Sequence, residues 1–597
     1  MKLVTIDWII IVLYAIVFLL TGLWMSRRSI KNIEEYFVAG RTLPWWLAGT
    51  SVAATWFASD APLAVVALIR KKGIYGNWLW WYLGAGVILT VFFYAKLWRR
   101  SRIITDAEFI ELRYSGRPAS ALRAFKACYE GLLRNCVTMG WVMLAVVKFN
   151  KVLLGWNPEL TLLICISMVL IYTIASGLWG VVAMDLFQYV VGMTGIMLMA
   201  VIVLYRLGGP AAMVEQIKSL DNSPPGLLDV VPDPRHIKPL EFISYLGLIF
   251  VLWLRQGEGG DGYLIQKLVA TRDEKQAVLS VLWFGFAGIV LMSWPWVVSG
   301  LGSLVIFPLD NPQLQADAEL AYPMMISEVM PAGFRGLLVV AFFAAFMSTM
   351  DTHLCWGASY MINDVYIRFI HPKASHRNSV FASRLAVFLL AVLAALTALK
   401  MQSIVQAWVY LLEVTAGIAG VCLLRWFWWR VNAWAEISAI ASSVFLANGN
   451  ICAKAAYKLH LLPESLWNYV QVVYSEQYGI LRALGILIVC TIIWLIVVLL
   501  TKPEPDEKLT AFYRRVRPGG WWGHIAKNNP DVQCEKSRKL PWLGWFCGTL
   551  FIYSSLTGVL YLCMGRYFLG GGLLVLSVIA GVCTFRAAKK VLSVLFE

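Results

Sequence analysis

Four oxygen-bearing side chains lie close together in the apolar stretch of residues 344–352: Ser348, Thr349, Asp351 and Thr352. This stretch is part of a longer apolar segment that begins near Leu337. Hydroxyls and a carboxylate are costly at the depth of a lipid bilayer unless they have a partner. Oxygen ligands on one helix suit a small, hard cation, and we expect sodium here. The alternative is that the hydroxyls only bond carbonyls one turn back.

The composition is that of a membrane protein. Of the 597 residues, 59% are hydrophobic and only 14% are charged, and the mean hydropathy is +0.68. Several apolar runs reach the roughly 20 residues that a helix needs to cross a bilayer. The net charge of +16 lies in basic clusters between these runs, as the positive-inside rule expects. We therefore predict an all-α protein that crosses the lipid bilayer many times, with no nucleic-acid partner.

About fifteen segments read as membrane helices by length and hydropathy. A first helix that starts outside places most Lys and Arg clusters in the cytoplasm, together with the C-terminus. The cluster Arg70, Lys71 and Lys72 is the exception. We expect a multi-pass monomer in the cell membrane, the inner membrane of a bacterium. The sequence shows no nucleophile–base pair, metal-ligand cluster or phosphate-binding loop, so we do not expect an enzyme.

Two of these segments have interiors that break a helix. Residues 51–62 end in Pro62, which lacks a backbone donor and disfavours helix before it. Residues 255–263 contain four glycines. Irregular backbone at membrane depth is tolerated where it lines a cavity or is buried in protein. The alternative is a simple kink at Pro62 and an ordinary glycine loop.

The spacing of the two breaks predicts an internal repeat. Each break opens a group of five spans, which fits two inverted repeats whose broken helices build ion and substrate sites near the midplane. This divides the chain into a leading helix with a cytoplasmic loop (1–45), a first repeat (46–207), a second repeat (240–430) and about four trailing helices with a cytoplasmic loop at 501–540 (431–597).

Polar and aromatic residues near the breaks are candidates for binding a small polar solute. Carboxylates and Trp faces suit hydroxyl-rich sugars, and they equally suit a cationic or amino-bearing solute. The candidates are Thr55, Trp56, Ser59, Asp60, Asn77, Trp81, Arg255, Gly257, Glu258, Asp261 and Glu413.

Four polar side chains, among them the candidate Arg255, also have structural readings. Arg255 could grip a carboxylate bidentately, or pair internally with an acidic neighbour. Glu130 and Arg134 are four residues apart and are expected to form a structural ion pair. His353 is expected to pack in the core. The ion-pair and packing readings do not depend on what the protein binds.

Several motifs together resemble the sodium:solute symporters, which include sugar, proline and sialic acid carriers. The resemblance covers roughly residues 35–434. The motifs are residues 36–46 (YFVAGRTLPWW), Ser176-Gly177-Leu178 with Asp185 and Gln188, Gln266-Lys267 with Ala270, and residues 333–338 (GFRGLL) leading to Met347-Ser348-Thr349, Asp364 and Tyr366.

The resemblance implies a LeuT-type fold with an extra leading helix, and sodium-coupled import of a small polar solute, with a sugar or sugar derivative favoured. It implies a sodium site made by the carbonyls of Ala54, Phe57 and Ala345 and the hydroxyls of Ser348 and Thr349.

Some members have a second sodium site, which here would use Asp185, Asp351 and Thr352. Members with that site carry hydroxyls at both positions of the eighth core helix, whereas Asp351 is a carboxylate. Asp351 could instead pair with a cation or carry a proton. The alternatives are therefore a proton-coupled transporter of a carboxylate- or amino-bearing solute, or a membrane sensor that keeps the fold. A tyrosine gate common in the family's sugar carriers is replaced by Gly257.

Overall fold

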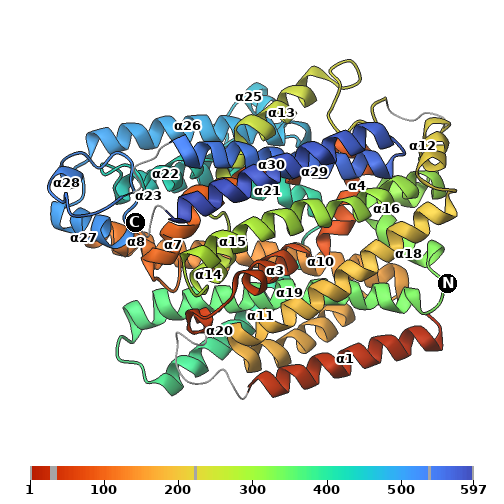
Figure 1. Cartoon of the computed structure of the whole chain (residues 1–597), viewed down its shortest axis with the longest axis horizontal. Coiled ribbons are helices and arrows are strands. Elements are labelled where there is room, and N and C mark those ends of the chain that lie inside the picture. Colours follow the sequence, from red (N-terminus) through yellow and green to blue (C-terminus); the bar gives the residue numbers. More distant parts are fainter. Residues whose placement is uncertain (1–2, 27–36, 221–224, 535–538, 594–597) are drawn as a thin grey trace.

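The computed structural model describes residues 3–26, 37–220, 225–534 and 539–593. These residues form helices and connecting loops, with two isolated β-bridges, Leu43 to Thr271 and Trp428 to Trp521, in place of any sheet. The loop predicted for residues 27–36 and the side chains of Ser176 and Gly177 lie outside what is described. The helices run roughly parallel to one long axis (Figure 1).

The first part of the chain forms α1 (Thr5–Ser26), α3 (Trp45–Trp56), α4 (Asp60–Lys72), α5 to α7 (within Ile74–Ser101), α8 (Glu108–Arg113), α9 and α10 (within Gly116–Leu153), α11 (Pro158–Arg206) and α12 (Pro210–Lys218). The middle part forms α13 (Pro239–Phe250), α14 (Gly262–Val269), α15 and α16 (within Glu274–Ile306), α17 (Pro312–Ala316), α18 (Ala321–Val329), α19 (Phe334–Ser359), its π-helical continuation η8 (Tyr360–Ile370), α20 (His376–Ala398), α21 (Ile404–Ala416) and α22 (Ala419–Leu424). The last part forms α23 (Ala433–Ala447), α24 (Gly449–Lys458), α25 (Glu464–Val473), α26 (Gly479–Leu500), α27 (Asp506–Val516), α28 (Gly523–Lys527), α29 (Lys539–Cys563) and α30 (Tyr567–Ser593).

Nine helices in the described residues are long and apolar enough to cross a membrane, and the bent pair α3–α4 makes a tenth. The other predicted spans are shorter apolar helices, or the second broken element. They are Thr5–Phe18, Pro158–Ile171, Ile404–Ala416, Ala433–Ala447 and residues 239–269. Each segment that the sequence predicts as a span therefore corresponds to helical structure, but the two separate spans predicted at 160–172 and 178–204 belong to one helix, α11.

The first predicted break is present. α3 ends at Trp56 and α4 begins at Asp60, and the two axes differ by 55°. Phe57 leaves the helical region with φ −71° and ψ 59°. Pro62 lies in the first turn of α4, where its missing backbone N–H has no helical partner to lose. The interruption therefore falls just before Pro62, and both halves remain helical.

The second break lies between α13 and α14. A short 3-10 turn, Leu252–Gln256, follows α13. Gly259 and Gly260 then adopt positive φ angles of 127° and 64°. A Cβ on Gly260 would lie 2.1 Å from the side-chain oxygen of Gln256, so a side chain has neither the conformation nor the space there. The glycine run is therefore required by the local backbone.

The leading helix α1 is fixed to the start of α19. The buried carboxylate of Asp7 accepts hydrogen bonds of 2.8 Å from the backbone N–H groups of Gly333 and Gly336. These groups open a helix and have no intrahelical acceptor, so Asp7 acts as a cap supplied by another helix. A Cβ on Gly336 would lie 2.6 Å from the Cα of Asp7, which shows how closely the two backbones approach.

Candidate functional site

The predicted cation site lies where the end of α3 meets the middle of α19. The Thr349 hydroxyl donates to the Ala345 carbonyl one turn back, as the alternative reading predicts, and also to the Thr55 carbonyl of α3, at 3.0 Å each. Because α3 stops at Trp56, its last carbonyls lose their usual helical donors and become available to other partners. Ala54, Phe57 and Ala345, the other backbone positions of the predicted site, are also buried. The structure thus gathers oxygens from both helices in one buried place.

Ser348 and Asp185 connect this site to α11. The Ser348 hydroxyl donates to Asp185 Oδ1 at 2.5 Å. Ser51, one turn before the end of α3, donates to the other carboxylate oxygen. A hydroxyl that donates its proton keeps lone pairs for a cation. Asp185 therefore lies directly beside the predicted sodium ligand Ser348.

Lys267 on α14 also reaches Asp185, and the sequence identified it only as part of a motif. Its ammonium lies 3.1 Å from Asp185 Oδ2, 2.7 Å from the Thr55 hydroxyl and 2.9 Å from the Thr352 hydroxyl. The Lys267 side chain is 0% exposed. Two of the three residues predicted to form a second cation site, Asp185 and Thr352, thus already contact a positive charge of the protein.

Asp351, the third residue of that predicted set, has a different partner. Its Oδ1 accepts a hydrogen bond of 2.5 Å from Thr173 of α11. It is 1% exposed. The carboxylate is thus held by a hydroxyl of the neighbouring helix.

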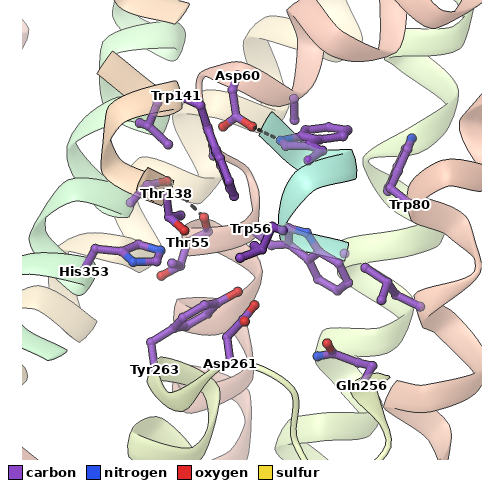
Figure 2. Close-up of a pocket in the computed structure, with 18 of the residues that line it drawn as sticks. Thr55, Trp56, Asp60, Trp80, Thr138, Trp141, Gln256, Asp261, Tyr263 and His353 are labelled. Carbon is purple, nitrogen blue, oxygen red and sulfur yellow. Dashed lines mark hydrogen bonds between the residues drawn. The ribbon is translucent and has the colours of Figure 1, made fainter. Parts of the chain in front are cut away.

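A cavity lies between the two broken helices and reaches the predicted cation site (Figure 2). Five predicted solute-binding residues line it: Thr55, Trp56, Asp60, Arg255 and Asp261. Thr349 lines it as well. Figure 2 shows Asp60 on one side of the cavity and Asp261 on the other, with Trp56 and Trp141 between them. The cavity and the predicted cation site therefore share Thr55 and Thr349.

The charged groups of the cavity differ in how they are paired. Arg134 bonds both Glu130 and Asp261, so the predicted Glu130–Arg134 pair is confirmed and has a third member. Arg255 donates to the hydroxyls of Thr415, at 2.5 Å, and Tyr82, at 3.4 Å, and no carboxylate of the described residues forms an ion pair with it.

One carboxylate oxygen of Asp60 has no donor on another described residue. The Trp408 indole donates to its Oδ2 at 2.9 Å. Its Oδ1 is buried and has no hydrogen-bond partner on another described residue. A buried carboxylate oxygen without a donor is costly, which makes it a natural acceptor for a bound group.

Three predicted solute residues do not line this cavity because their polar groups are used within the protein. The Ser59 hydroxyl donates to the Val142 carbonyl at 3.1 Å. Asn77 bonds the Ile74 carbonyl and the Trp80 indole. Trp81 donates to Ser293 at 3.1 Å. The polar groups of all three residues are thus used for contacts within the protein.

Gly257, Glu258 and Glu413 also lie away from this cavity. A Cβ on Gly257 would meet Leu89 at 2.7 Å, so its place is filled by packing. Glu258 pairs with Arg425 at 2.8 Å, and Arg425 also pairs with Glu436 at 2.9 Å. Glu413 pairs with Arg482 at 2.7 Å. Both of these predicted solute carboxylates are thus neutralised by arginines, of which Arg425 is buried and Arg482 is partly buried.

Much of the cavity wall is made of residues that sequence reasoning did not identify. They include Trp80, Thr138, Trp141, Gln256, Tyr263, Trp296, His353, Trp356 and Trp408. Composition does not show which face of a helix a tryptophan occupies, so the sequence does not place these tryptophans on the cavity wall. His353 bonds Asn135 at 2.6 Å and packs against Tyr263, so the packed histidine that the sequence predicts is confirmed, although it also borders the cavity.

Comparisons with known proteins identify the family and the fold of this chain. A family model described as the sodium:solute symporter family matches residues 36–441. The sodium/glucose cotransporter of Vibrio parahaemolyticus is 24% identical over 462 residues, which cover 74% of this chain and 84% of the relative. The sodium/mannose cotransporter SLC5A10 of Bos taurus is 24% identical over 464 residues, which cover 72% of this chain and 76% of the relative.

A solved structure has a similar fold. It is a substrate-bound, outward-open Na+-coupled sialic acid symporter, which matches with a TM-score of 0.64 at 19% identity and covers 84% of this chain and 99% of its own. The family match spans both broken helices, α11 and α19, and more than half of the chain. The chain therefore belongs to the sodium:solute symporter family, whose members are membrane transporters, and has the LeuT-type fold.

Proposed function

We propose that this protein imports a small polar organic solute together with sodium, by alternating access. The carbonyls of Ala54, Phe57 and Ala345 and the hydroxyls of Ser348 and Thr349 bind the ion. The observation that carries the proposal is the pair of 3.0 Å hydrogen bonds that the Thr349 hydroxyl makes to Thr55 and Ala345, at the end of a helix that stops inside the bundle. Hydroxyl and carbonyl oxygens are suitable ligands for a partly dehydrated hard ion.

Two residues that the cation site and the solute cavity share account for the coupling of sodium to solute. Thr55 and Thr349 belong to the wall of the solute cavity and to the junction of α3 with α19. A sodium ion that holds this junction also fixes part of the cavity, so ion and solute each raise the affinity for the other. The membrane potential contributes about 2.3 kcal/mol for each elementary charge per 100 mV. Transport is the whole activity that we propose, without covalent chemistry.

The solute is proposed to be a sugar or a sugar derivative. The cavity presents several Trp faces, which cover the C–H surfaces of a sugar ring, and the Asp60 oxygen, which accepts a hydroxyl. The relatives named above carry glucose and mannose in their names. The cavity residues Thr55, Trp56, Asp60, Arg255 and Asp261 are the proposed solute ligands.

The domain boundaries predicted from the sequence remain part of the proposal. The bent pair α3–α4 opens the repeat at 46–207, and the element around α14 opens the repeat at 240–430. We propose a monomer as the working unit. We propose the cell membrane of a bacterium as its location, with the C-terminus in the cytoplasm.

Thermal stability of the purified protein tests the function. Sugars, sugar acids, amino acids and nucleosides are added with sodium or with choline at equal ionic strength. We expect stabilisation by sugars that requires sodium, followed by sodium-driven uptake of the same sugars into proteoliposomes. Uptake driven by a pH jump without sodium would instead favour the proton-coupled alternative. An absence of any sodium effect on stability, binding and uptake would overturn the proposal.

A further inference from the structure

The ammonium of Lys267 lies in a shell of four oxygens from three helices. The Ser51 carbonyl at 3.0 Å and the Thr55 hydroxyl at 2.7 Å come from α3. Asp185 Oδ2, at 3.1 Å, comes from α11, and the Thr352 hydroxyl, at 2.9 Å, comes from α19. Lysine is strongly hydrated in water, so full burial requires that such a shell replace its water.

This shell has the composition of an alkali-ion site. One carboxylate, two hydroxyls and one backbone carbonyl are oxygen donors of the kind that a hard cation takes. An ammonium has three protons for these four oxygens, so the shell offers more acceptors than the lysine has donors. The Lys267 ammonium therefore has the surroundings of a bound cation, in addition to its ion pair with Asp185.

Charge balance explains why a cation must be present here. Asp185 is buried, and it accepts hydrogen bonds from Ser348 and Ser51 in addition to its contact with Lys267. These bonds orient the carboxylate but do not neutralise it. Without a cation, the charge would be uncompensated in a low-dielectric interior, which is strongly unfavourable.

A free ion and the ammonium exclude each other at this position. A sodium ion that contacts Asp185 Oδ2 and the Thr352 hydroxyl would occupy the volume that Lys267 fills or lie directly beside its positive charge. Like charges at such short separation repel strongly in a protein interior. The proposed sodium site at Thr349 is separate from the shell around Lys267. Thr349 bonds the backbone carbonyls of Thr55 and Ala345, neither of which contacts Lys267.

We propose that Lys267 permanently takes the place of a second coupling cation, so that this carrier binds one sodium ion per transport cycle. The proposal rests on the sodium-coupled function proposed above. It assigns Asp185 and Thr352 to the lysine and leaves the Ser348–Thr349 site to the ion. A tethered charge balances Asp185 in every state of the cycle without being carried across the membrane.

The test counts sodium ions bound to purified full-length protein without solute. Radioactive sodium is titrated at constant ionic strength with choline as the replacement cation. We expect wild type to bind one ion with a Hill coefficient close to one. We expect Lys267→Ala to bind two ions, because removal of the ammonium opens the shell around Asp185. The double variant Lys267→Ala with Asp185→Asn is expected to return to one ion.

Each other outcome overturns either the lysine proposal alone or sodium coupling as well. Two ions on wild type, or one ion on both wild type and Lys267→Ala, would overturn the lysine proposal while sodium coupling stands. No sodium binding by wild type would overturn sodium coupling itself, and the lysine proposal with it. The variants are purified in sodium throughout, and Lys267→Gln, whose neutral side chain is one atom shorter than that of lysine, replaces Lys267→Ala if the latter does not fold.

Discussion

The Trp408 indole donates a 2.9 Å hydrogen bond to one carboxylate oxygen of Asp60, and the other oxygen of Asp60 faces no donor from another described residue. The bond joins α21 to the first turn of α4, just after the break. It fixes the orientation of the carboxylate, so that the unpartnered oxygen can serve a solute in the adjoining cavity. A single contact thus positions a potential solute ligand in advance.

Replacement of Asp60 by Asn should weaken solute binding. A hydrogen bond to a charged group contributes about 1.5–3 kcal/mol, so the KM of the solute should rise about 10- to 100-fold. Sodium binding without solute should change little. Uptake kinetics in proteoliposomes measure the first quantity and sodium titration the second. Trp408→Phe, which removes the orienting donor and part of the ring at the cavity wall, should have a smaller effect. An unchanged KM in Asp60→Asn would remove this residue from the solute site.

Removal of the Ser348 and Thr349 hydroxyls should abolish most of the sodium dependence of transport. With two ligands lost at roughly 1–1.5 kcal/mol each, the sodium concentration for half-maximal uptake should rise about 30-fold or more. Ser359→Ala is a matched control on α19, because the Ser359 hydroxyl bonds only its own helix at the Trp356 carbonyl. Equal sodium dependence in the double variant and the control would contradict the assignment.

Glu258→Gln should lower stability without changing solute recognition. The Glu258 carboxylate pairs with the buried Arg425, and loss of one partner from a buried pair costs about 3–5 kcal/mol. The variant should therefore unfold at a lower temperature, while the solute KM of the folded fraction stays at the wild-type value. The exposed residue Asp310 provides a control, since Asp310→Asn should change neither quantity. A raised KM at unchanged stability would place Glu258 in the solute site after all.

Glu111, in α8, should give the stability of the protein a pH dependence. Burial alone would raise the pKa of Glu111, but hydrogen bonds from Arg368, Ser120 and Arg123 outweigh it and lower the pKa to about 2. Because the folded-state pKa is below that of the unfolded chain, the stabilisation is complete above pH about 4.5 and is lost as the pH falls towards 2.

Glu111→Gln should therefore lower the melting temperature at pH 7, and its difference from wild type should shrink as the pH falls below about 4.5. Thermal unfolding across a pH series measures the difference. Glu507→Gln, at an exposed position, should show little difference at any pH. A gap for Glu111→Gln that stays constant with pH would show that the carboxylate charge is not responsible.

The breaks in the helices could be predicted because their causes are local. Pro62 and the glycines at 257–262 disfavour helix wherever they occur, and the oxygen-bearing residues of α19 are visible within one segment. The partners of Glu258 and Glu413 could not be predicted in this way. Arg425 lies 167 residues from Glu258 in sequence, and the pairing depends on how α22 packs against the second break.

Lys267 is a second case in which the sequence does not identify the partners of a charged side chain. Hydropathy places it in an apolar helix, where an ionisable residue already suggests a function. Its long side chain reaches oxygens on three other helices, and only tertiary packing determines which ones. The wall of tryptophans around the cavity is a similar case, since helical periodicity gives a buried face but not the neighbour that it meets.

The cap that Asp7 forms on α19 has a practical consequence for measurements of motion. Two hydrogen bonds and a glycine contact without space for a methyl group tie the leading helix to the start of the helix that carries Ser348 and Thr349. α1 should therefore be displaced with α19 as one body during the cycle. A spin label or fluorophore on the lipid-facing side of α1 would then report the movement of the ion-binding helix from outside the bundle, leaving the binding residues unmodified.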